Sequence, residues 1–444
     1  DDFKLTDVLN YKGWKNMVDK DKKIRRYSFS FKKIWYTFFT AFLKFTLGNW
    51  LKYKFNLKLE NKSFKFPEPP YFVISNHIQF WDPFIISYFS KYPLFWIVSD
   101  DYFRSKTLAS LLKLVGGIPK SKFVADRLAT KRIFKAIKDG YCIGIFPEGN
   151  RNWGGTTGGI ISSTANLIKY SKIPVVSFVL KGAYLSYPRW AKYTRKNVLQ
   201  VEAKTILTSI QIENLSVQQI EKRVYDSIFF DENRWNEDYN FKFKGKKLAE
   251  KSELAIFIYP VCKSFSSLVS QGDILQCKIC NFSKNFLENG TLSSNFSKIS
   301  EIYNFNIDKV NDITKNIHQW LKWQIEYLNK IINDKKNSND TVNPIFIDEQ
   351  MLLLKGKKFE KLQLLGEGKV LFFIDRLEFY LNDTAKKYLF YIKKMYGENV
   401  QQNDKFDFYY ENGDIFRLFK PGKLISAFKY ESTCRLIKEI SPNV

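Results

Sequence analysis

Tyr71-Phe-Val-Ile-Ser-Asn-His77-Ile-Gln-Phe-Trp-Asp82-Pro83 joins an apolar run to a histidine and an aspartate. The run Tyr71-Phe-Val-Ile-Ser75 predicts a buried strand, and Pro83 predicts the start of a helix. Histidine is the usual general base near neutral pH, and a carboxylate can fix its tautomer. The pair alone has two readings: a catalytic dyad, or a core histidine beside a helix-capping aspartate.

Working outward, short apolar runs alternate with longer mixed segments from about residue 70 to 205. The further predicted strands are Leu94–Val98, Cys142–Phe146 and Val175–Leu180, and the predicted helices are Ser105–Leu114, Ala125–Lys138, Ile160–Tyr170 and Ser216–Phe229. This alternation predicts an α/β fold in which a mixed sheet is flanked by helices.

Two further segments carry groups suited to an anionic substrate. Ile143-Gly-Ile-Phe-Pro-Glu148-Gly149-Asn-Arg151 overlaps the end of a predicted strand, and Arg151 offers a planar fork of donors to phosphate. Gly116-Gly-Ile-Pro-Lys120-Ser-Lys122 is a glycine turn followed by two lysines. Taken singly, each segment also reads as an ordinary loop between a strand and a helix.

In this order and spacing, the segments resemble the glycerolipid acyltransferase family, whose best-known members acylate lysophosphatidic acid. The resemblance rests on His-x-x-x-x-Asp at His77 and Asp82 and on Phe-Pro-Glu-Gly-x-Arg at Phe146 to Arg151. Ile173-Pro-Val-Val176 stands where the family has a fourth block, and the likeness covers roughly residues 25–230.

The resemblance implies a role for each motif residue. His77 would deprotonate the free hydroxyl of a lysophospholipid, which attacks an acyl thioester of coenzyme A or acyl carrier protein, and Asp82 would hold His77 in position. Arg151 and Gly149 would bind the acceptor's phosphate, with Glu148 orienting Arg151 or the acceptor. The reaction so implied uses no cofactor.

The chain departs from the family's pattern in the residues around these motifs. Gln79 and Asn150 stand where relatives often carry Ser and Thr, and Lys122, with Lys120 as its competitor, stands where the second block commonly ends in Arg. Lysine attracts phosphate but lacks the bidentate geometry of arginine. These changes leave the implied acyl-transfer chemistry unchanged. They leave open which acceptor the chain uses.

The formal net charge is +26, and residues 1–66 hold 16 Lys or Arg against 6 Asp or Glu. An excess of this size predicts an anionic partner, either nucleic acid or an acidic membrane, unless it reflects biased genome composition. Between Lys33 and Lys44, a helix would place Lys33, Thr37, Thr40 and Lys44 on one stripe and aromatic side chains over the rest. Such a segment predicts an in-plane helix at a membrane surface, or else a helix packed on the protein's own core.

Cys262, Cys277 and Cys280 resemble a zinc ribbon in which Tyr259 replaces one ligand. Three thiolates, with water or a distant group such as His318, would bind structural zinc, and the alternative is a remnant that binds no metal. The incomplete ribbon argues against nucleic acid as the partner. Cysteines this sparse, and a first segment without a secretory pattern, predict a reducing setting at the cytoplasmic face of the cell membrane, with peripheral or monotopic attachment.

The expected organisation is a basic aromatic membrane-association region (1–66), a catalytic domain (67–245), the cysteine unit (256–300), a helix with a polar linker (301–343) and a β-rich domain (344–444). The last is similar in element order to a pleckstrin-homology or GRAM-like barrel. The predicted function is acyl transfer to lysophosphatidic acid or a related lysophospholipid in phospholipid biosynthesis. The alternative is a non-catalytic membrane-binding protein on an acyltransferase scaffold.

Overall fold

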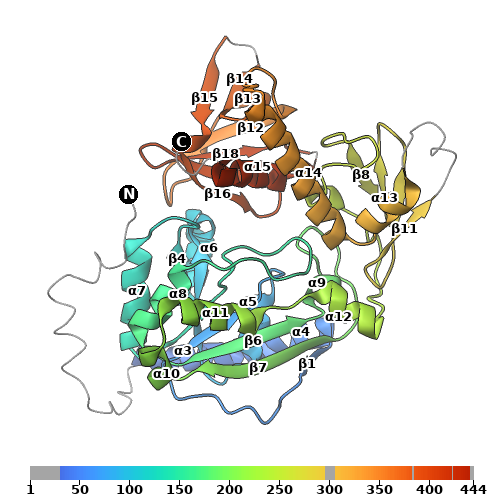
Figure 1. Cartoon of the computed structure of the whole chain (residues 1–444). Helices are drawn as coiled ribbons and strands as arrows, with labels where there is room; N and C mark the ends of the chain where they lie inside the picture. The colour runs from blue at the N-terminus through green and yellow to red at the C-terminus, as the bar shows by residue number, and fades with distance from the viewer. Residues whose placement is uncertain (1–30, 296–305, 383–384, 423, 441–444) are drawn as a thin grey trace. The chain divides into compact units, whose positions relative to one another are not determined.

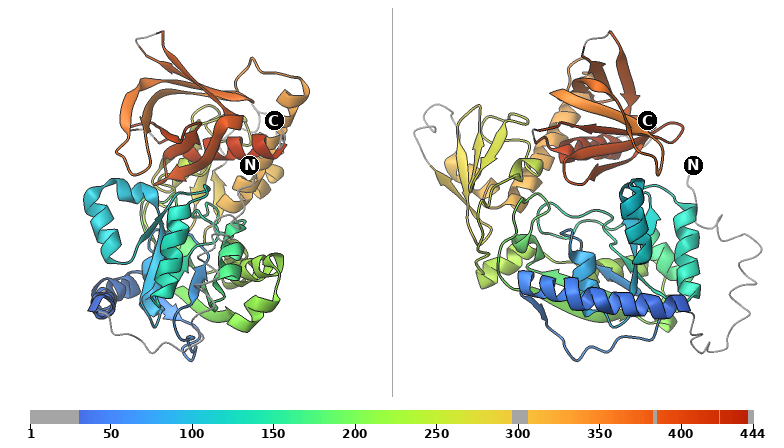
Figure 2. Two further views of the ribbon diagram at one scale, coloured as in Figure 1. Left: turned by 90° about the vertical axis from the view of Figure 1, so that its left-hand side faces the viewer. Right: turned by 180° about the vertical axis from the view of Figure 1, so that it is seen from behind.

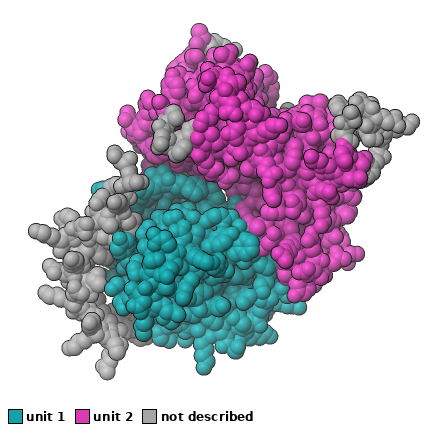
Figure 3. Space-filling view, in the orientation of Figure 1, with its two compact units in different colours: residues 1–151, 157–181, 198–230 teal, residues 152–156, 182–197, 231–444 magenta. Residues whose placement is uncertain are grey.

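The computed structural model describes residues 31–295, 306–382, 385–422 and 424–440. Residues 1–30 of the predicted region 1–66 therefore lie outside the described residues. The chain divides into two compact units: residues 1–151, 157–181 and 198–230 form unit 1, and the remainder forms unit 2 (Figure 3).

Unit 1 is built on a seven-stranded sheet in the order β1-β7-β6-β2-β5-β3-β4. Neighbours from β6 to β4 are parallel, whereas β7 runs antiparallel to β6 and β1 runs parallel to β7. The strands are β1 (Leu57–Leu59), β2 (Phe72–Ser75), β3 (Leu94–Ser99), β4 (Ile118–Lys120), β5 (Cys142–Ile145), β6 (Val175–Lys181) and β7 (Leu199–Leu207). The predicted mixed α/β fold is confirmed.

Helices cover both faces of this sheet. The helices between and after the strands are α5 (Asp82–Phe89), η2 (Asp100–Arg104), α6 (Lys106–Leu114), α7 (Arg127–Lys138), α8 (Ser163–Ser171), α10 (Ser209–Asn214) and α11 (Val217–Ile228). Helices α8 and α11 lie in front of the sheet in Figure 1, and the long N-terminal helix crosses the opposite face in the right-hand view of Figure 2. Ser216 caps α11 in a capping box with Gln219, as a serine at this position predicts.

The N-terminal helix runs through α3 (Phe31–Leu43), a π-helical turn η1 (Lys44–Gly48) and α4 (Asn49–Phe55). Lys44 of the predicted basic stripe turns inward, because its Nζ donates a hydrogen bond to the carbonyl of Ser90. Burial lowers the pKa of Lys44 to about 8. The aromatic face remains exposed at Trp35, Phe38, Phe42 and Phe45.

The topology explains why the motifs of unit 1 meet. Strands β2 and β5 are adjacent and parallel, with Phe72 opposite Ile143 and Ile74 opposite Ile145. Their carboxyl ends therefore open onto the same edge of the sheet, which is where open α/β sheets bind ligands. His77 follows β2 and the segment from Phe146 to Arg151 follows β5.

Unit 2 begins with α9 (Ala183–Ser186), α12 (Glu232–Tyr239) and η3 (Ser252–Leu254), followed by a four-stranded antiparallel sheet. The strands of this sheet are β8 (Leu268–Gln271), β9 (Ile274–Cys277), β10 (Ser283–Phe286) and β11 (Leu292–Asn295). Within region 301–343, the apolar periodicity predicts one helix over Ile307–Ile332 and a polar linker from Asn333. The single helix is wrong, because α13 (Ile307–Ile313) and α14 (Ile317–Asn337) are separate and Asn316 caps α14. Helix α14 also extends past Asn333 into the predicted linker.

The chain ends in a seven-stranded antiparallel sheet in the order β15-β14-β13-β12-β18-β17-β16. Its strands are β12 (Phe346–Gly356), β13 (Gln363–Phe372), β14 (Arg376–Leu381), β15 (Lys387–Tyr391), β16 (Met395–Gln401), β17 (Lys405–Tyr410) and β18 (Asp414–Phe419), with η5 (Ile392–Lys394) before β16. Helix α15 (Ala427–Ile440) contacts β16 and β17. The predicted β-rich C-terminal domain is confirmed. The Asn412-Gly413 pair predicts a two-residue hairpin turn between β17 and β18, but Tyr410 pairs with Asp414, which leaves three residues in the turn.

No helix among the described residues is both long enough and apolar enough to cross a membrane.

Candidate active site

The predicted dyad forms at the end of β2. The Nδ1 atom of His77 lies 2.9 Å from Oδ2 of Asp82, which is the first residue of α5. The same oxygen accepts hydrogen bonds from the backbone amides of Ile78 (2.6 Å) and Gln79 (2.9 Å). Asp82 is fully buried, so these three contacts fix its carboxylate. With Nδ1–H donating to the carboxylate, we assign the free lone pair to Nε2, the nitrogen that can accept a proton.

Aromatic side chains hold the imidazole from one face. The ring of His77 stacks on Phe146, with centroids 3.8 Å apart and planes within 13°. Trp96 of β3 stacks behind Phe146 at 4.9 Å. Neither Phe146 nor Trp96 was predicted to hold the imidazole. The stacking role of Phe146 could have been predicted, because Phe146 stands directly before Pro147 in the motif that follows β5. The role of Trp96 could not, because Trp96 is one of several aromatic residues in apolar strands.

The pKa of His77 is lowered from its ordinary value, chiefly because the imidazole is buried. The hydrogen bond and the charge of Asp82 raise the pKa, whereas the positive charges of Arg151 and Lys122 lower it. Burial prevails, so His77 is neutral at neutral pH. A neutral imidazole is the form that a general base requires.

Glu148 connects two loops at the sheet edge. Its Oε1 accepts the backbone N–H of His77 (2.7 Å), and its Oε2 accepts the backbone N–H of Gly158 (2.9 Å). The side chain is therefore placed to hold the backbone of His77. Its predicted contact with substrate stays a prediction.

Lys122, Asn150, Gly149 and Arg151 come together beside the dyad. Lys122 Nζ lies 2.6 Å from Oδ1 of Asn150, and both Lys122 and Arg151 act on the pKa of His77. Gly149 has a φ of +73°, and its N–H donates to the carbonyl of Phe146 at 3.0 Å, so this amide closes the turn. Its predicted contact with phosphate stays a prediction.

Lys120 points elsewhere. Its Nζ donates to the carbonyls of Ser121 (3.0 Å) and Val124 (3.4 Å) in its own loop. Of the two lysines that the sequence left in competition, Lys122 is the one whose charge acts on His77.

Asn76 and Gln79 are polar residues on either side of His77 in the sequence, and their side chains do not belong to the His77–Asp82 pair. The side chain of Asn76 bonds both the N–H (2.9 Å) and the carbonyl (3.0 Å) of Leu180, which pins the end of β2 to β6. Gln79 is fully buried, and its side-chain amide has no hydrogen-bond partner among the described residues. Its position close to the dyad agrees with its expected bearing on acceptor choice, which stays a prediction.

The three cysteines of the predicted metal site also come together, in unit 2. The Sγ atoms of Cys262, Cys277 and Cys280 all lie within 4.8 Å of one another. His318 is not part of this group, and its Nδ1 lies 3.1 Å from the hydroxyl of Thr156. The expectation that His318 is a ligand is therefore wrong.

Unit 1 is an α/β domain that places a hydrogen-bonded histidine–aspartate pair at the carboxyl ends of parallel strands. Residues 56–181 match the family model described as Acyltransferase, and this part of the chain is therefore an acyltransferase domain of that family. The match contains both motifs on which the resemblance rests, so that resemblance is confirmed for these residues.

Among solved structures, the chain is similar to the 1-acyl-sn-glycerophosphate (LPA) acyltransferase PlsC from Thermotoga maritima. The two share 15% sequence identity with a TM-score of 0.36, over 48% of this chain and 92% of that chain. At this level the similarity assigns neither substrate nor mechanism. A search of curated proteins found no match.

Proposed function

We propose that the chain transfers a fatty acyl group from a thioester, acyl-CoA or acyl carrier protein, to the free hydroxyl of lysophosphatidic acid or a related lysophospholipid. The observation that carries the proposal is the hydrogen bond between His77 and Asp82 beside two cationic side chains, Arg151 and Lys122. This arrangement provides a neutral base for a hydroxyl and positive charge for a phosphate.

The chemistry needs no covalent acyl-enzyme. His77 Nε2 takes the proton from the acceptor hydroxyl as its oxygen attacks the thioester carbonyl. The tetrahedral intermediate then expels the thiolate, which receives that proton from the imidazolium. The products are an ester and a free thiol, and base assistance of this kind contributes about 10²–10⁴ in rate. Asp82 stabilises the imidazolium between the two proton transfers.

We further propose that the domain acts at the cytoplasmic face of an anionic membrane, bound peripherally. Support comes from the N-terminal helix, whose large exposed side chains are Ile34, Trp35, Phe38, Phe42, Phe45, Trp50 and Tyr53. Exposed aromatic residues on a helix with lysines are suited to the interfacial zone of a bilayer.

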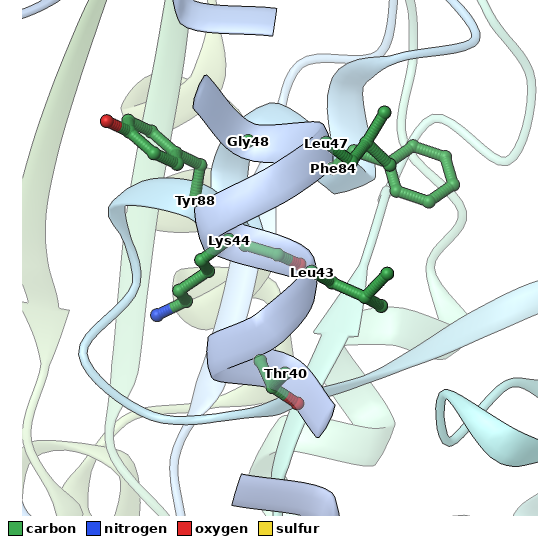
Figure 4. A pocket seen from close by; sticks show the side chains of 8 residues that line it. Thr40, Leu43, Lys44, Leu47, Gly48, Phe84 and Tyr88 are labelled. Atoms are coloured by element: carbon green, nitrogen blue, oxygen red, sulfur yellow. The ribbon is translucent and has the colours of Figure 1, made fainter. Parts of the chain in front are cut away.

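The inner face of this helix is not itself a chain-binding tunnel. A cavity of about 40 Å³ lies between α3–η1 and α5, bounded in part by Leu43, Lys44, Gly48 and Tyr88 (Figure 4). That volume holds only a few water molecules, so it does not accommodate a fatty acyl chain. Addition of a methyl group at Gly48 would clash with Tyr88 at 2.4 Å, so the helix and α5 are tightly packed.

The acceptor class is tested with a panel of acceptors and a labelled acyl thioester. We expect transfer to lysophosphatidic acid and much less to the monoacylglycerol that lacks the phosphate. In Arg151→Ala the preference for the phosphate should shrink, because KM for lysophosphatidic acid rises more than KM for monoacylglycerol. Equal use of both acceptors by the unmodified chain would contradict phosphate recognition. A failure to acylate any lysophospholipid would favour the non-catalytic scaffold.

A further inference from the structure

The cysteine unit contains two turns of the same backbone geometry. In the first, the N–H of Lys263 donates to the carbonyl of Tyr259 (2.8 Å), and the N–H of Tyr259 donates to the carbonyl of Ser264 (3.3 Å). In the second, the N–H of Asn281 donates to the carbonyl of Cys277 (2.9 Å), and the N–H of Cys277 donates to the carbonyl of Phe282 (3.0 Å).

The left-handed residue of each turn also matches, since Lys263 and Asn281 both have a φ of +57°. By this correspondence Cys262 is equivalent to Cys280, and Tyr259 is equivalent to Cys277. Two facing turns of this kind, each with Cys-x-x-Cys, are what a tetrahedral zinc site uses. The first turn therefore keeps the backbone of a ligand turn although a tyrosine occupies its first ligand position.

The thiols are spaced as ligands of one ion. Sulfur atoms bound to the same tetrahedral zinc lie roughly 3.8 Å apart, since each Zn–S bond is about 2.3 Å. The Sγ atoms of Cys262 and Cys277 are 3.5 Å apart, and Cys280 lies within 4.8 Å of both. Cys277 and Cys280 are buried, which suits a structural metal rather than an exposed reactive thiol.

A hydroxyl group also lies beside two of the thiols. Ser264 Oγ lies 2.9 Å from Sγ of Cys262 and 3.8 Å from Sγ of Cys277. An oxygen and a sulfur bound to the same zinc are separated by about 3.5 Å, which falls between these distances. Tyr259 is fully buried against Phe282 and Trp320, where its ring fills the space of the missing cysteine.

We propose that Cys262, Cys277 and Cys280 bind one zinc ion as thiolates and that the Ser264 hydroxyl supplies the fourth ligand. Binding releases the three thiol protons. The ion ties the first turn to the second, which joins β9 to β10.

The proposed zinc site is also connected by hydrogen bonds to the C-terminal sheet. Ser266, in the segment that follows the first turn, accepts a hydrogen bond from Lys429 Nζ at 2.7 Å. Lys429 is fully buried and forms an ion pair with Asp348 of β12 at 2.7 Å. Loss of zinc should therefore loosen a segment that contacts a buried charge.

The test is metal analysis of the purified full chain kept under reductant. We expect stoichiometric zinc in the unmodified chain and in Cys434→Ser, whose cysteine is buried and isolated, but not in Cys277→Ser. Ser264→Ala should weaken zinc binding by about tenfold or more in chelator competition. Tyr259→Cys should tighten it, because a fourth thiolate replaces the oxygen.

Cobalt substitution of the unmodified chain gives a readout that does not depend on whether a variant folds. Thiolate-to-cobalt charge-transfer absorption with tetrahedral d–d bands is expected. Zinc content equal to that of Cys277→Ser, absence of the charge-transfer bands, or a disulfide among these cysteines under reductant would each overturn the proposal.

Discussion

His77 is subject to opposing influences on its protonation, and their balance fixes the pH range in which it can act as a base. Burial is the largest influence and lowers the pKa, while Asp82 raises it through a hydrogen bond and a charge. The acid limb of kcat/KM should therefore have its midpoint below the ordinary histidine value of about 6.5.

Replacement of Asp82 by Asn removes the influence that raises this pKa. We expect the acid limb of the pH–rate profile to move to still lower pH in Asp82→Asn. The plateau rate should fall by about 10²–10⁴, because the imidazolium formed in the reaction loses its counterion. The profile of kcat/KM between pH 4 and 8 checks both effects, and an acid limb displaced toward higher pH would contradict the assigned roles.

Glu148 is a positioning residue in this account, because its two oxygens accept the backbone N–H groups of His77 and Gly158. In Glu148→Gln one of these amides faces an NH₂ group. We expect kcat to fall by about 10²-fold, the loss that a displacement of roughly 1 Å can cause. Glu213→Gln is the matched control, since Glu213 forms an exposed pair with Lys172. Equal kcat in the two variants would refute the positioning role.

The convergence of His77, Asp82, Glu148 and Arg151 was predictable from the sequence, because these residues stand in motifs of fixed spacing. The stack of His77, Phe146 and Trp96 was not. It depends on β3 and β2 flanking β5 on either side, which is a property of strand order and not of spacing along the chain.

Among the secondary-structure elements, β2 and β6 are also joined by the side chain of one residue. Asn76 bonds both backbone groups of Leu180. In Asn76→Ala these buried groups lose their partner, which should reduce the free energy of unfolding by about 1–3 kcal/mol. Urea denaturation measures this, with the exposed Asn214→Ala as control, for which little change is expected. No loss of stability in Asn76→Ala would contradict the inferred contribution of these bonds.

The central strands and most helices of unit 1 followed from apolar periodicity, because buried parallel strands are short uninterrupted apolar runs. Helix boundaries that depend on a capping residue were harder to predict from the sequence. The break between α13 and α14 occurs where Asn316 accepts the N–H of Gln319, while the apolar periodicity continues across it. The inward contact of Lys44 was also not predictable, because only the tertiary structure places the carbonyl of Ser90 within reach of its side chain.

For the whole molecule, the proposed membrane contact is the exposed face of the N-terminal helix. Replacement of Phe38, Phe42 and Phe45 by serine should reduce co-sedimentation with vesicles of anionic phospholipid by tenfold or more, since each buried aromatic side chain contributes about 1.5–3 kcal/mol. Ile210→Ser, at a residue of similar exposure in α10, serves as the control. Undiminished binding of the triple variant would place the membrane contact elsewhere.

The organisation of the chain beyond unit 1 was predictable only in outline. The C-terminal domain showed its β-rich pattern, but the strand order, with β12 paired to β18, depends on contacts between distant residues. The cysteine unit was recognisable from its spacing, whereas the repeated turn geometry that supports a zinc site is visible only in the folded backbone.

The central claim is that His77 acts as the base in acyl transfer by the full chain. Its most direct test is the single-turnover rate of transfer from labelled acyl-CoA or acyl carrier protein to lysophosphatidic acid, measured for the unmodified chain and for His77→Ala. We expect transfer by the unmodified chain and a rate about 10²–10⁴ lower in the variant, with membrane binding retained. Equal rates in the two proteins would contradict it.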